Sequence, residues 1–479
     1  MFFCFVCFGE KAVKTYKGIK SDPNNTSVIS QPLQIGRLEL KNRLIRSSIS
    51  GRIDNYDGSG TPARVHFEEQ FARGGVSAII SSHAPITPGG RVLPNYAMID
   101  QDARIGFWKL VGERVRSHDN CKFILQLSHS GRQQDINGVE NSGRYPAGAT
   151  SRADYFHGFP SRAMSKVEIA QIVEMFAAAA ERALKAELDG IELHSANGYL
   201  FTQFLSSAIN DREDHYGGSL ENRARFLMEV IEAIQRRIGK EFPLIVKITG
   251  HDYHNAAGVW PRQDGNGIED AIQIAQWVEA AGVHAIHVST GNMFPHPLNP
   301  AGPIPAEVAR ETSQSLINSG RWTFRNFLGF RYFGWAVQWL WRRTQPFWDS
   351  SGQIDPSRLE GLASADAKAI REKVRIPVLL TGGFQTAHGI GRVLREGACD
   401  AVTIARPLLA NPNLPHELIA GWDGPQDPPC TYCNKCLLHV LEHPLGCYDE
   451  DRFVGRGGRE EMLRQVFAVF NDYTGPGKS

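Results

Sequence analysis

The chain has 479 residues, a length that fits about three average domains or one large barrel with additional segments. Apolar residues make up 42% of the sequence and charged residues 22%, as in an ordinary globular protein with a sizeable core. The net charge of +1 excludes a globally basic nucleic-acid binder and a long acidic tail. No stretch reaches the roughly 20 apolar residues that span a bilayer, and the eight cysteines are too few for a disulfide scaffold.

Residues 1–30 are expected to form an N-terminal tail. Its first eight residues, Met1 to Phe8, are apolar, but no basic segment precedes them and no small-residue cleavage site follows, so they do not match a secretory signal. Weak membrane contact, with acylation at Cys4 or Cys7, is the alternative. This interpretation favours a cytoplasmic, reducing location, in which Cys121 and Cys399 are expected to be buried thiols.

Short apolar runs alternate with longer amphipathic stretches between residues 31 and 425. The eight runs are Asn42–Ile49, Val76–Ser82, Lys122–Leu127, Gly190–Leu193, Pro243–Ile248, Val283–Val288, Ile376–Leu380 and Ala401–Ile404. Each has four to eight residues and is rich in Ile, Val and Leu, as expected of a strand buried on both faces. Between them, Ser165–Ala186 and Ser219–Ile238 repeat apolar residues close to the period of a helix.

Eight strand–helix units imply a parallel sheet, and eight is the number that closes a barrel. The expected fold is therefore α/β, a (β/α)8 TIM barrel over residues 31–425. An open doubly wound sheet is the alternative. It is disfavoured because no run leads into a Gly-x-Gly-x-x-Gly turn with an acidic residue about 20 positions further on.

An aromatic-rich insertion of residues 295–350 interrupts this pattern after the sixth run. Its aromatic residues include Trp322, Phe324, Phe327, Phe330, Tyr332, Phe333, Trp335, Trp339, Trp341 and Trp348. The charged residues from Arg321 to Arg343 are all arginines, and no acidic residue occurs between Glu311 and Asp349. Three interpretations stay open: an insertion packed on the outside of the barrel, a lid over an apolar active site, and peripheral membrane contact. Nucleic-acid binding is not expected from one short patch.

Functional side chains in a closed parallel barrel follow the C-terminal ends of the strands. The seventh run ends in Thr381-Gly382-Gly383-Phe384, and the eighth ends in Ala405-Arg406-Pro407. Glycines let backbone N–H groups approach an anion, and Arg406 supplies positive charge. These two strand ends therefore predict a phosphate site.

His194, Asn197 and Tyr199 follow the fourth run. His194 and Asn197 are neutral donors three residues apart, and together they can stabilise negative charge that develops on one carbonyl oxygen. Tyr199 has a phenolic proton to give from another side of a substrate. Taken alone, a His-x-x-Asn pattern is also typical of a capped helix start.

Longer motifs around these residues resemble the old yellow enzyme family of flavin oxidoreductases. The resemblance rests on Asp189-Gly190-Ile191-Glu192-Leu193-His194-Ser195-Ala196-Asn197-Gly198-Tyr199-Leu200, on residues 210–226, on residues 126–132, and on the two strand ends of the phosphate site. It runs from about Pro32 to Pro415, interrupted by the insertion. It implies a barrel that binds FMN non-covalently and uses NAD(P)H as its reductant.

The resemblance also implies which residues meet the flavin ring. Ser47, Ser48 and Ile49 should line one edge of the ring. Ser50 stands where the family keeps a Thr or Cys that tunes the redox potential. Gln126 should bond the pyrimidine edge.

Three further contacts with FMN follow from the resemblance. His83 should contact the flavin through its backbone. Lys247 stands where the family usually has an Arg beside flavin N1 and O2; it keeps the charge that stabilises a reduced flavin but lacks the planar fork. The phosphate should be held by Gly383, Phe384, Ala405 and Arg406.

The implied activity is that of an ene-reductase, in which hydride from NAD(P)H passes through FMN to the double bond of an α,β-unsaturated, enone-like small molecule. The substrate should be bound by His194, Ser195, Ala196 and Asn197, with Tyr199 as proton donor. A flavin-assisted isomerase or epimerase is the alternative within the enzyme class. A non-catalytic binding barrel is the alternative outside it, and the intact catalytic residues argue against it. The choice between NADH and NADPH and the oligomeric state stay open.

Residues 426–479 are expected to form a short Cys-containing extension. The spacing of Cys430, Cys433, Cys436 and Cys447 suggests an iron–sulfur or zinc site. Relatives similar to 2,4-dienoyl-CoA reductase carry a 4Fe–4S cluster here, but they continue into further electron-transfer domains, whereas this chain ends at Ser479. The middle spacing is also one residue tighter than expected for the cluster. A relic or a small structural metal site is therefore favoured over an iron–sulfur cluster.

Overall fold

The computed structural model describes residues 18–49, 51–134, 146–153, 161–254, 265–293, 296–312, 321–350 and 353–471. The apolar start of the chain, with Cys4 and Cys7, lies outside these ranges, and so does Ser50.

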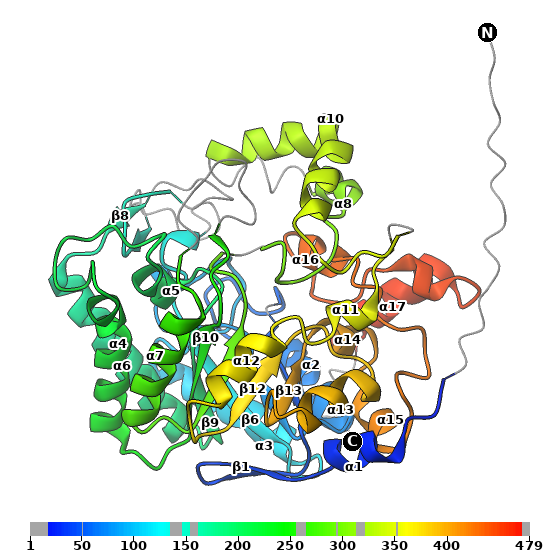
Figure 1. The fold of residues 1–479 in the computed structure, drawn as a ribbon, viewed down its shortest axis with the longest axis horizontal. Helices are drawn as coiled ribbons and strands as arrows, with labels where there is room; N and C mark the ends of the chain where they lie inside the picture. Colours follow the sequence, from blue (N-terminus) through cyan, green and yellow to red (C-terminus); the bar gives the residue numbers. More distant parts are fainter. Residues whose placement is uncertain are drawn as a thin grey trace.

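Eight parallel strands form a closed barrel (Figure 1). They are β3 (Leu44–Arg46), β4 (Ala78–Ile80), β6 (Lys122–Ser128), β9 (Gly190–Ser195), β10 (Leu244–Thr249), β11 (Ala285–Ser289), β12 (Val378–Thr381) and β13 (Ala401–Ile404). Strands that follow one another in this order are paired, and β13 pairs with β3, with Val402 opposite Leu44, to close the ring. Each predicted run overlaps one strand, so the (β/α)8 barrel is confirmed and the open sheet is wrong.

Helices cover the outside of the barrel. They are α2 (Pro62–Arg73), α3 (Ile105–Arg116), α4 (Lys166–Lys185), α6 (Leu220–Ile238), α7 (Ile268–Ala280), α12 (Ser364–Arg371) and α13 (Ala387–Arg395). The predicted helices are α4 and α6. Helix α4 begins at a capping box, in which the Ser165 hydroxyl accepts from the N–H of Glu168 and the Glu168 carboxylate accepts from the N–H of Ser165.

An antiparallel hairpin closes the bottom of the barrel. Its strands β1 (Leu33–Ile35) and β2 (Leu38–Leu40) are joined by a two-residue turn whose first residue, Gly36, has φ +54°. A Cβ at Gly36 would lie 2.3 Å from the ring of His284, so glycine is needed for the turn to approach the barrel. Leu38 and Leu40 pack with inward-facing residues of the strands, among them Ile45, Ile80, Ile124, Ile245 and Leu379.

A polar layer lies above this apolar floor inside the barrel. The His287 ring lies between Glu192 and Thr403, with Nδ1 2.7 Å from the Glu192 carboxylate and Nε2 2.9 Å from the Thr403 hydroxyl. Burial lowers the pKa of Lys247, and the neighbouring Glu192 carboxylate opposes that shift. Burial raises the pKa of Glu192, but His287 and Lys247 together hold it below its usual range. This layer is the base on which the site is built.

A buried ionic network fastens α2 to the outside of β3. Arg46 donates to Glu68 at 2.5 Å, and Arg64 donates to Glu68 at 3.3 Å and to Asp54 at 2.6 Å. All four side chains are shielded from solvent. Because Arg46 directly precedes Ser47 and Ser48, the network fixes the strand end that is expected to meet the flavin.

Replacing Glu68 with Ala is expected to lower the free energy of unfolding by about 3–5 kcal/mol, because two buried guanidinium groups lose a shared carboxylate. Urea unfolding followed by circular dichroism measures the change. Glu113→Ala, at an exposed position of α3, is the control and should change stability by less than about 0.5 kcal/mol. Equal unfolding midpoints for the two variants would contradict the structural role of the network.

The insertion forms helices beside the mouth of the barrel. They are α8 (Ala306–Glu311), α10 (Arg321–Arg343), which is kinked at Phe333, and the short α11 (Pro356–Leu359) that follows the insertion. Figure 1 shows α10 at the upper edge of the molecule, with α8 beneath it and the β1–β2 hairpin at the opposite end. No helix in the described ranges is long and apolar enough to cross a membrane.

The C-terminal extension packs back onto the barrel. It contains α16 (Lys435–His439), η5 (Glu450–Phe453) and α17 (Gly458–Asn471). The Val469 carbonyl lies 3.2 Å from Nδ1 of His66 in α2. Leu438 and Leu441 join an apolar cluster with α8 and α10, so the extension and the insertion support each other.

The remaining described elements connect these parts. They are α1 (Pro23–Ile29), β5 (Ala84–Pro85), η1 (Pro88–Gly90), η2 (Asp102–Arg104), η3 (Gly131–Gln133), β7 (Ala147–Gly148), β8 (Arg162–Ala163), α5 (Leu200–Leu205), α14 (Arg406–Ala410) and α15 (Leu414–Ile419).

Candidate functional site

The predicted catalytic residues lie on one sharp turn at the end of β9. His194 is in the strand, Asn197 and Gly198 have left-handed φ values of +60° and +79°, and Tyr199 directly precedes α5. A Cβ at Gly198 would lie 2.5 Å from Nε2 of Gln133 and 2.7 Å from the carbonyl oxygen of Asn292. Glycine therefore lets the turn press against the loops that follow β6 and β11.

Aromatic rings gather around this turn. The His194 and Tyr199 ring centroids are 4.8 Å apart, and the His83 ring lies 5.2 Å from Tyr199 and 6.3 Å from His194. Tyr96 lies 5.7 Å from His83. His83 was expected to contribute only through its backbone, but its ring belongs to this cluster. Tyr96 was not predicted, because a tyrosine in a loop carries no signal in the sequence that links it to His194.

His194 and Tyr199 are both in protonation states that allow them to donate hydrogen bonds. Burial, with the nearby charges of Lys247, His83 and His287, holds the pKa of His194 well below its usual value, so the ring is neutral. Burial and the neighbouring Tyr96 raise the pKa of Tyr199, so its phenol stays protonated. The cluster can therefore donate hydrogen bonds and one proton without itself carrying charge.

Inward-facing polar atoms at three neighbouring strand ends are left unsatisfied. Ser82 Oγ, Ser128 Oγ and His194 Nδ1 are buried and have no hydrogen-bond partner within the part of the chain that the structure describes. Ser82 follows β4, and Ser128 and His194 lie at the ends of β6 and β9; the three strands are adjacent in the barrel. Buried polar atoms without partners are rare unless a ligand satisfies them, so these strand ends fit the polar edge of a bound flavin.

The predicted flavin-ring residues that the structure describes converge on the same mouth. Gln126 Nε2 donates to Ser48 Oγ at 3.0 Å and to Glu192 Oε1 at 2.7 Å. Lys247 lies opposite His194 in the register of β9 and β10 and is buried. Ser47 is buried at the end of β3, and Ile49 is partly buried and packs against the main core. Ser195 and Ala196 are also buried, between His194 and Asn197.

The predicted phosphate residues surround a small cavity of ≈ 70 Å³. Gly382, Gly383, Ala405 and Arg406 line it, together with residues 298–301 from the root of the insertion. The Phe384 side chain does not face this cavity; it is fully buried in the core around the barrel, so only its backbone is placed to contribute.

The cysteine segment supports the phosphate cavity from outside. Arg406 donates to the Ala301 carbonyl at 2.6 Å and to Asn434 Oδ1, and its guanidinium lies 5.4 Å from the Tyr432 ring centroid. The Tyr432 hydroxyl donates to the Gly383 carbonyl at 2.6 Å. Tyr432 and Asn434 were not predicted as site residues, because no sequence motif links the Cys-rich extension with strands β12 and β13.

The four cysteines Cys430, Cys433, Cys436 and Cys447 line one cavity of ≈ 20 Å³. Burial raises the pKa of Cys430 to about 12 and also raises that of Cys433 and Cys436. Within the described ranges, no three His, Cys, Asp or Glu side chains are arranged to hold a metal ion. Outside this set, Cys121 and Cys399 are buried free thiols, as predicted.

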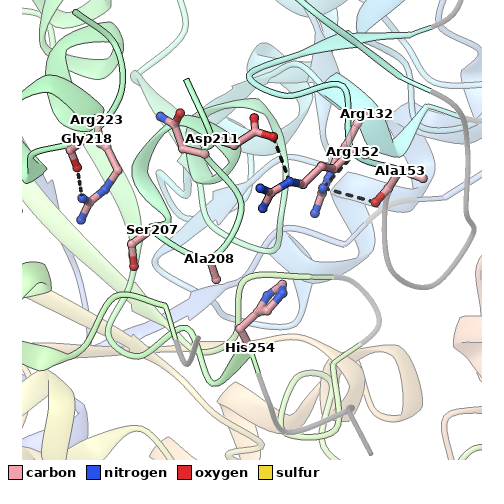
Figure 2. Close-up of a pocket in the computed structure, with 10 residues that line it drawn as sticks. Arg132, Arg152, Ala153, Ser207, Ala208, Asp211, Gly218, Arg223 and His254 are labelled. Atoms are coloured by element: carbon pink, nitrogen blue, oxygen red, sulfur yellow. Dashed lines mark hydrogen bonds and ion pairs between the residues drawn. The ribbon is translucent and has the colours of Figure 1, made fainter. Parts of the chain in front are cut away.

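A larger cavity of ≈ 750 Å³ is lined in part by Ser207 and Ala208, which follow α5 (Figure 2). Its walls include Arg132, Arg152, Arg223, His254 and Asp211, from the loops after β6, β9 and β10 and from α6. Arg152 pairs with Asp211 at 2.8 Å, whereas Arg223 donates to the Leu205 and Gly218 carbonyls and to Asn266 Oδ1, which are neutral acceptors. Among the described lining residues, arginines outnumber acidic side chains, and the size of the cavity suits a small-molecule ligand.

The chain is similar to known proteins. Residues 29–319 match the NADH:flavin oxidoreductase / NADH oxidase family, and residues 358–471 match the dihydrouridine synthase family. The chain is 29% identical to an NADH oxidase of Thermoanaerobacter brockii over 87% of this chain and 56% of the relative. It is 35% identical to an NADPH dehydrogenase of Halalkalibacterium halodurans over 54% of this chain and 72% of the relative.

Solved structures confirm the fold. A 2-naphthoyl-CoA reductase complex matches with a TM-score of 0.70 at 21% identity, over 88% of this chain and 56% of that one. A morphinone reductase matches with a TM-score of 0.60 at 24% identity, over 84% and 92%. The chain spans about half the length of the NADH oxidase and the 2-naphthoyl-CoA reductase. The resemblance to old yellow enzyme is confirmed: the chain belongs to the NADH:flavin oxidoreductase / NADH oxidase family, whose members are NAD(P)H-dependent flavin oxidoreductases.

Proposed function

We propose that this chain binds FMN, takes reducing equivalents from NAD(P)H, and reduces the activated carbon–carbon double bond of an enone-like small molecule. The observation that carries the proposal is the turn after β9, where a neutral His194 with a buried, unsatisfied Nδ1 lies beside a protonated Tyr199. Family membership and the named NADH- and NADPH-using relatives support the reductant.

Bound FMN would supply the hydride-transfer chemistry at the mouth of the barrel. Gln126 would hold the pyrimidine edge, with Ser47, Ser48, Ile49 and Ser50 along the ring, and Lys247 would place a cation near it. Gly383, Ala405, Arg406 and the backbones of Phe384 and His83 would complete the site. The arginine-lined cavity beside α5 offers room and positive charge for the phosphates of NAD(P)H.

The substrate residues act on two different atoms. His194 and Asn197 hold the carbonyl oxygen and stabilise negative charge as it develops there. Tyr199 delivers its proton to the α-carbon, and its raised pKa keeps that proton available at neutral pH. The backbone of Ser195 and Ala196 sets the spacing between the two donors.

Anaerobic assays in two halves test the proposal. NAD(P)H should reduce the bound flavin in the absence of an enone, and adding an enone should then restore the oxidised spectrum with one saturated product per flavin. Conversion of substrate without any use of NAD(P)H would instead indicate the isomerase or epimerase alternative and contradict the proposal.

The pH dependence of enone reduction is expected to show no inflection near pH 6.5, because the pKa of His194 lies well below that value. Any alkaline loss should come from Lys247, since burial lowers the pKa of Lys247 from 10.5 but raises that of Tyr199 above 10. Lys247→Arg should remove the alkaline inflection. Stopped-flow rates across pH measure this, and an inflection near pH 6.5 would contradict a neutral His194.

We also propose that the four cysteines have a structural role and do not hold an iron–sulfur cluster for electron transfer. Their cavity is small, and Arg452 donates to Cys447 Sγ at 3.2 Å. Asn434 and Tyr432, which lie between these cysteines in the sequence, bond to Arg406 and Gly383 of the phosphate cavity, and this supports a role of the cysteine segment in holding that wall in place.

A further inference from the structure

Helix α10 carries a face of large apolar side chains that protein does not cover within the described ranges. Tyr332, Phe333, Trp335, Trp339 and Leu340 are 62%, 60%, 75%, 53% and 47% exposed. Trp335 and Trp339 are four residues apart, after the kink at Phe333, and so project from the same side of the helix. A large exposed apolar patch of this kind is typical of a surface that binds another protein or a membrane.

The opposite face of α10 is anchored to the protein. Trp341 Nε1 donates to the Gly302 carbonyl at 3.0 Å, and Gln338 Nε2 donates to the Ile304 carbonyl at 3.1 Å. Val337 and Trp341 pack against the apolar cluster of α8 and α16. These contacts fix the rotation of the helix and leave Trp335 and Trp339 exposed. Helix α10 itself lies at the upper edge of the molecule (Figure 1).

The charged residues of α10 itself are all arginines. Arg331, Arg342 and Arg343 border the exposed face, and the Arg343 guanidinium lies 4.6 Å from the Trp339 ring centroid. No acidic residue occurs between Glu311 and Asp349. A second copy of this chain paired on the same face would bring arginines against arginines, so the charge pattern disfavours a self-complementary dimer.

An anionic lipid surface complements both the exposed aromatic face and the arginines beside it. Tryptophan and tyrosine place an apolar ring and a polar tip at the boundary between acyl chains and headgroups, and arginine pairs with lipid phosphates. An amphipathic helix with aromatic residues on one face and basic residues beside them lies in the plane of that boundary. Helix α10 is not apolar enough to cross it.

We propose that α10 docks this protein peripherally on a bilayer that contains anionic phospholipid. Trp335 and Trp339 enter the acyl boundary, and Arg331, Arg342 and Arg343 contact the headgroups. The root of the insertion, residues 298–301, lines the phosphate cavity, so the docked face lies at the same end of the barrel as the active site. The bilayer would therefore lie near the mouth through which substrate enters.

Sedimentation with vesicles tests the proposal on the full-length holoprotein. Vesicles of phosphatidylcholine with roughly 30% phosphatidylserine should carry the wild type down, and vesicles of phosphatidylcholine alone should bind it more weakly. The double variant Trp335→Ser/Trp339→Ser should lose about tenfold or more in affinity. The double variant Leu110→Ser/Val167→Ser, at exposed positions of α3 and α4, is the matched control and should bind as the wild type does.

Two further measurements distinguish binding through α10 from binding through residues 1–17, and a lipid surface from a second copy of the chain. A variant without residues 1–17 should still bind, and loss of binding on this truncation would overturn the assignment to α10. Equal binding of the wild type and Trp335→Ser/Trp339→Ser would also overturn it. Failure to bind vesicles, together with a dimer in light scattering that the same double variant dissociates, would assign the face to a second copy. None of these readouts depends on flavin or on catalysis.

Discussion

Replacing Tyr199 with Phe is expected to slow enone reduction by about 10²–10⁴-fold, because the variant keeps the ring but lacks the proton that a positioned general acid supplies. The buried ring packs against His194 and His83 in both forms, so FMN binding should be retained. Reduction of the flavin by NAD(P)H needs no such proton and should change by less than about threefold. Stopped-flow traces of the two half-reactions measure each effect separately.

The matched control for this variant is Tyr56→Phe, which removes a phenol at a position that is 48% exposed. It should leave both half-reactions unchanged. An enone rate in Tyr199→Phe equal to that of the wild type would remove Tyr199 as the proton donor. Tyr96, whose presence raises the pKa of Tyr199, would then be the next phenol to replace.

Replacing His194 with Ala is expected to lower the rate of enone reduction by about 10²–10³-fold, since one of two donors to the developing negative charge is lost. His194→Asn keeps a neutral hydrogen-bond donor, so its rate of enone reduction should fall less than that of His194→Ala. Binding of a phenol that mimics the charged oxygen should weaken in the same order, wild type, Asn, Ala. Titration of the flavin spectrum with such a phenol measures the order, and equal affinities would contradict the role of His194.

The barrel could be predicted because its strands are buried on both faces and read as apolar runs. The polar layer inside it could not be predicted in the same way. Glu192 and His287 lie in different runs, and their 2.7 Å contact exists only because β9, β10 and β11 are adjacent on a closed ring. A sequence pattern predicts that a strand is buried, but it does not predict which residue pairs with a buried charged side chain.

The sequence predicts candidate site residues where one turn carries several of them, and the structure places His194, Asn197 and Tyr199 on one turn at the end of β9. The site was not predictable where distant segments meet. Tyr432 reaches the Gly383 carbonyl from the extension, and Tyr96 reaches His83 from a loop, over contacts with no local signature. The buried network of Arg46 in β3 with Glu68 and Arg64 in α2 was not predicted for the same reason, since Arg and Glu side chains are usually solvated.

The most direct test of the account is the visible absorption spectrum of the purified protein under anaerobic conditions, before and after addition of NAD(P)H. We expect the bands of about one bound flavin per chain, bleaching on addition of NAD(P)H, and none of the broad absorption of an iron–sulfur cluster. A colourless protein that does not take up added FMN would contradict the central claim that this barrel is a flavin site.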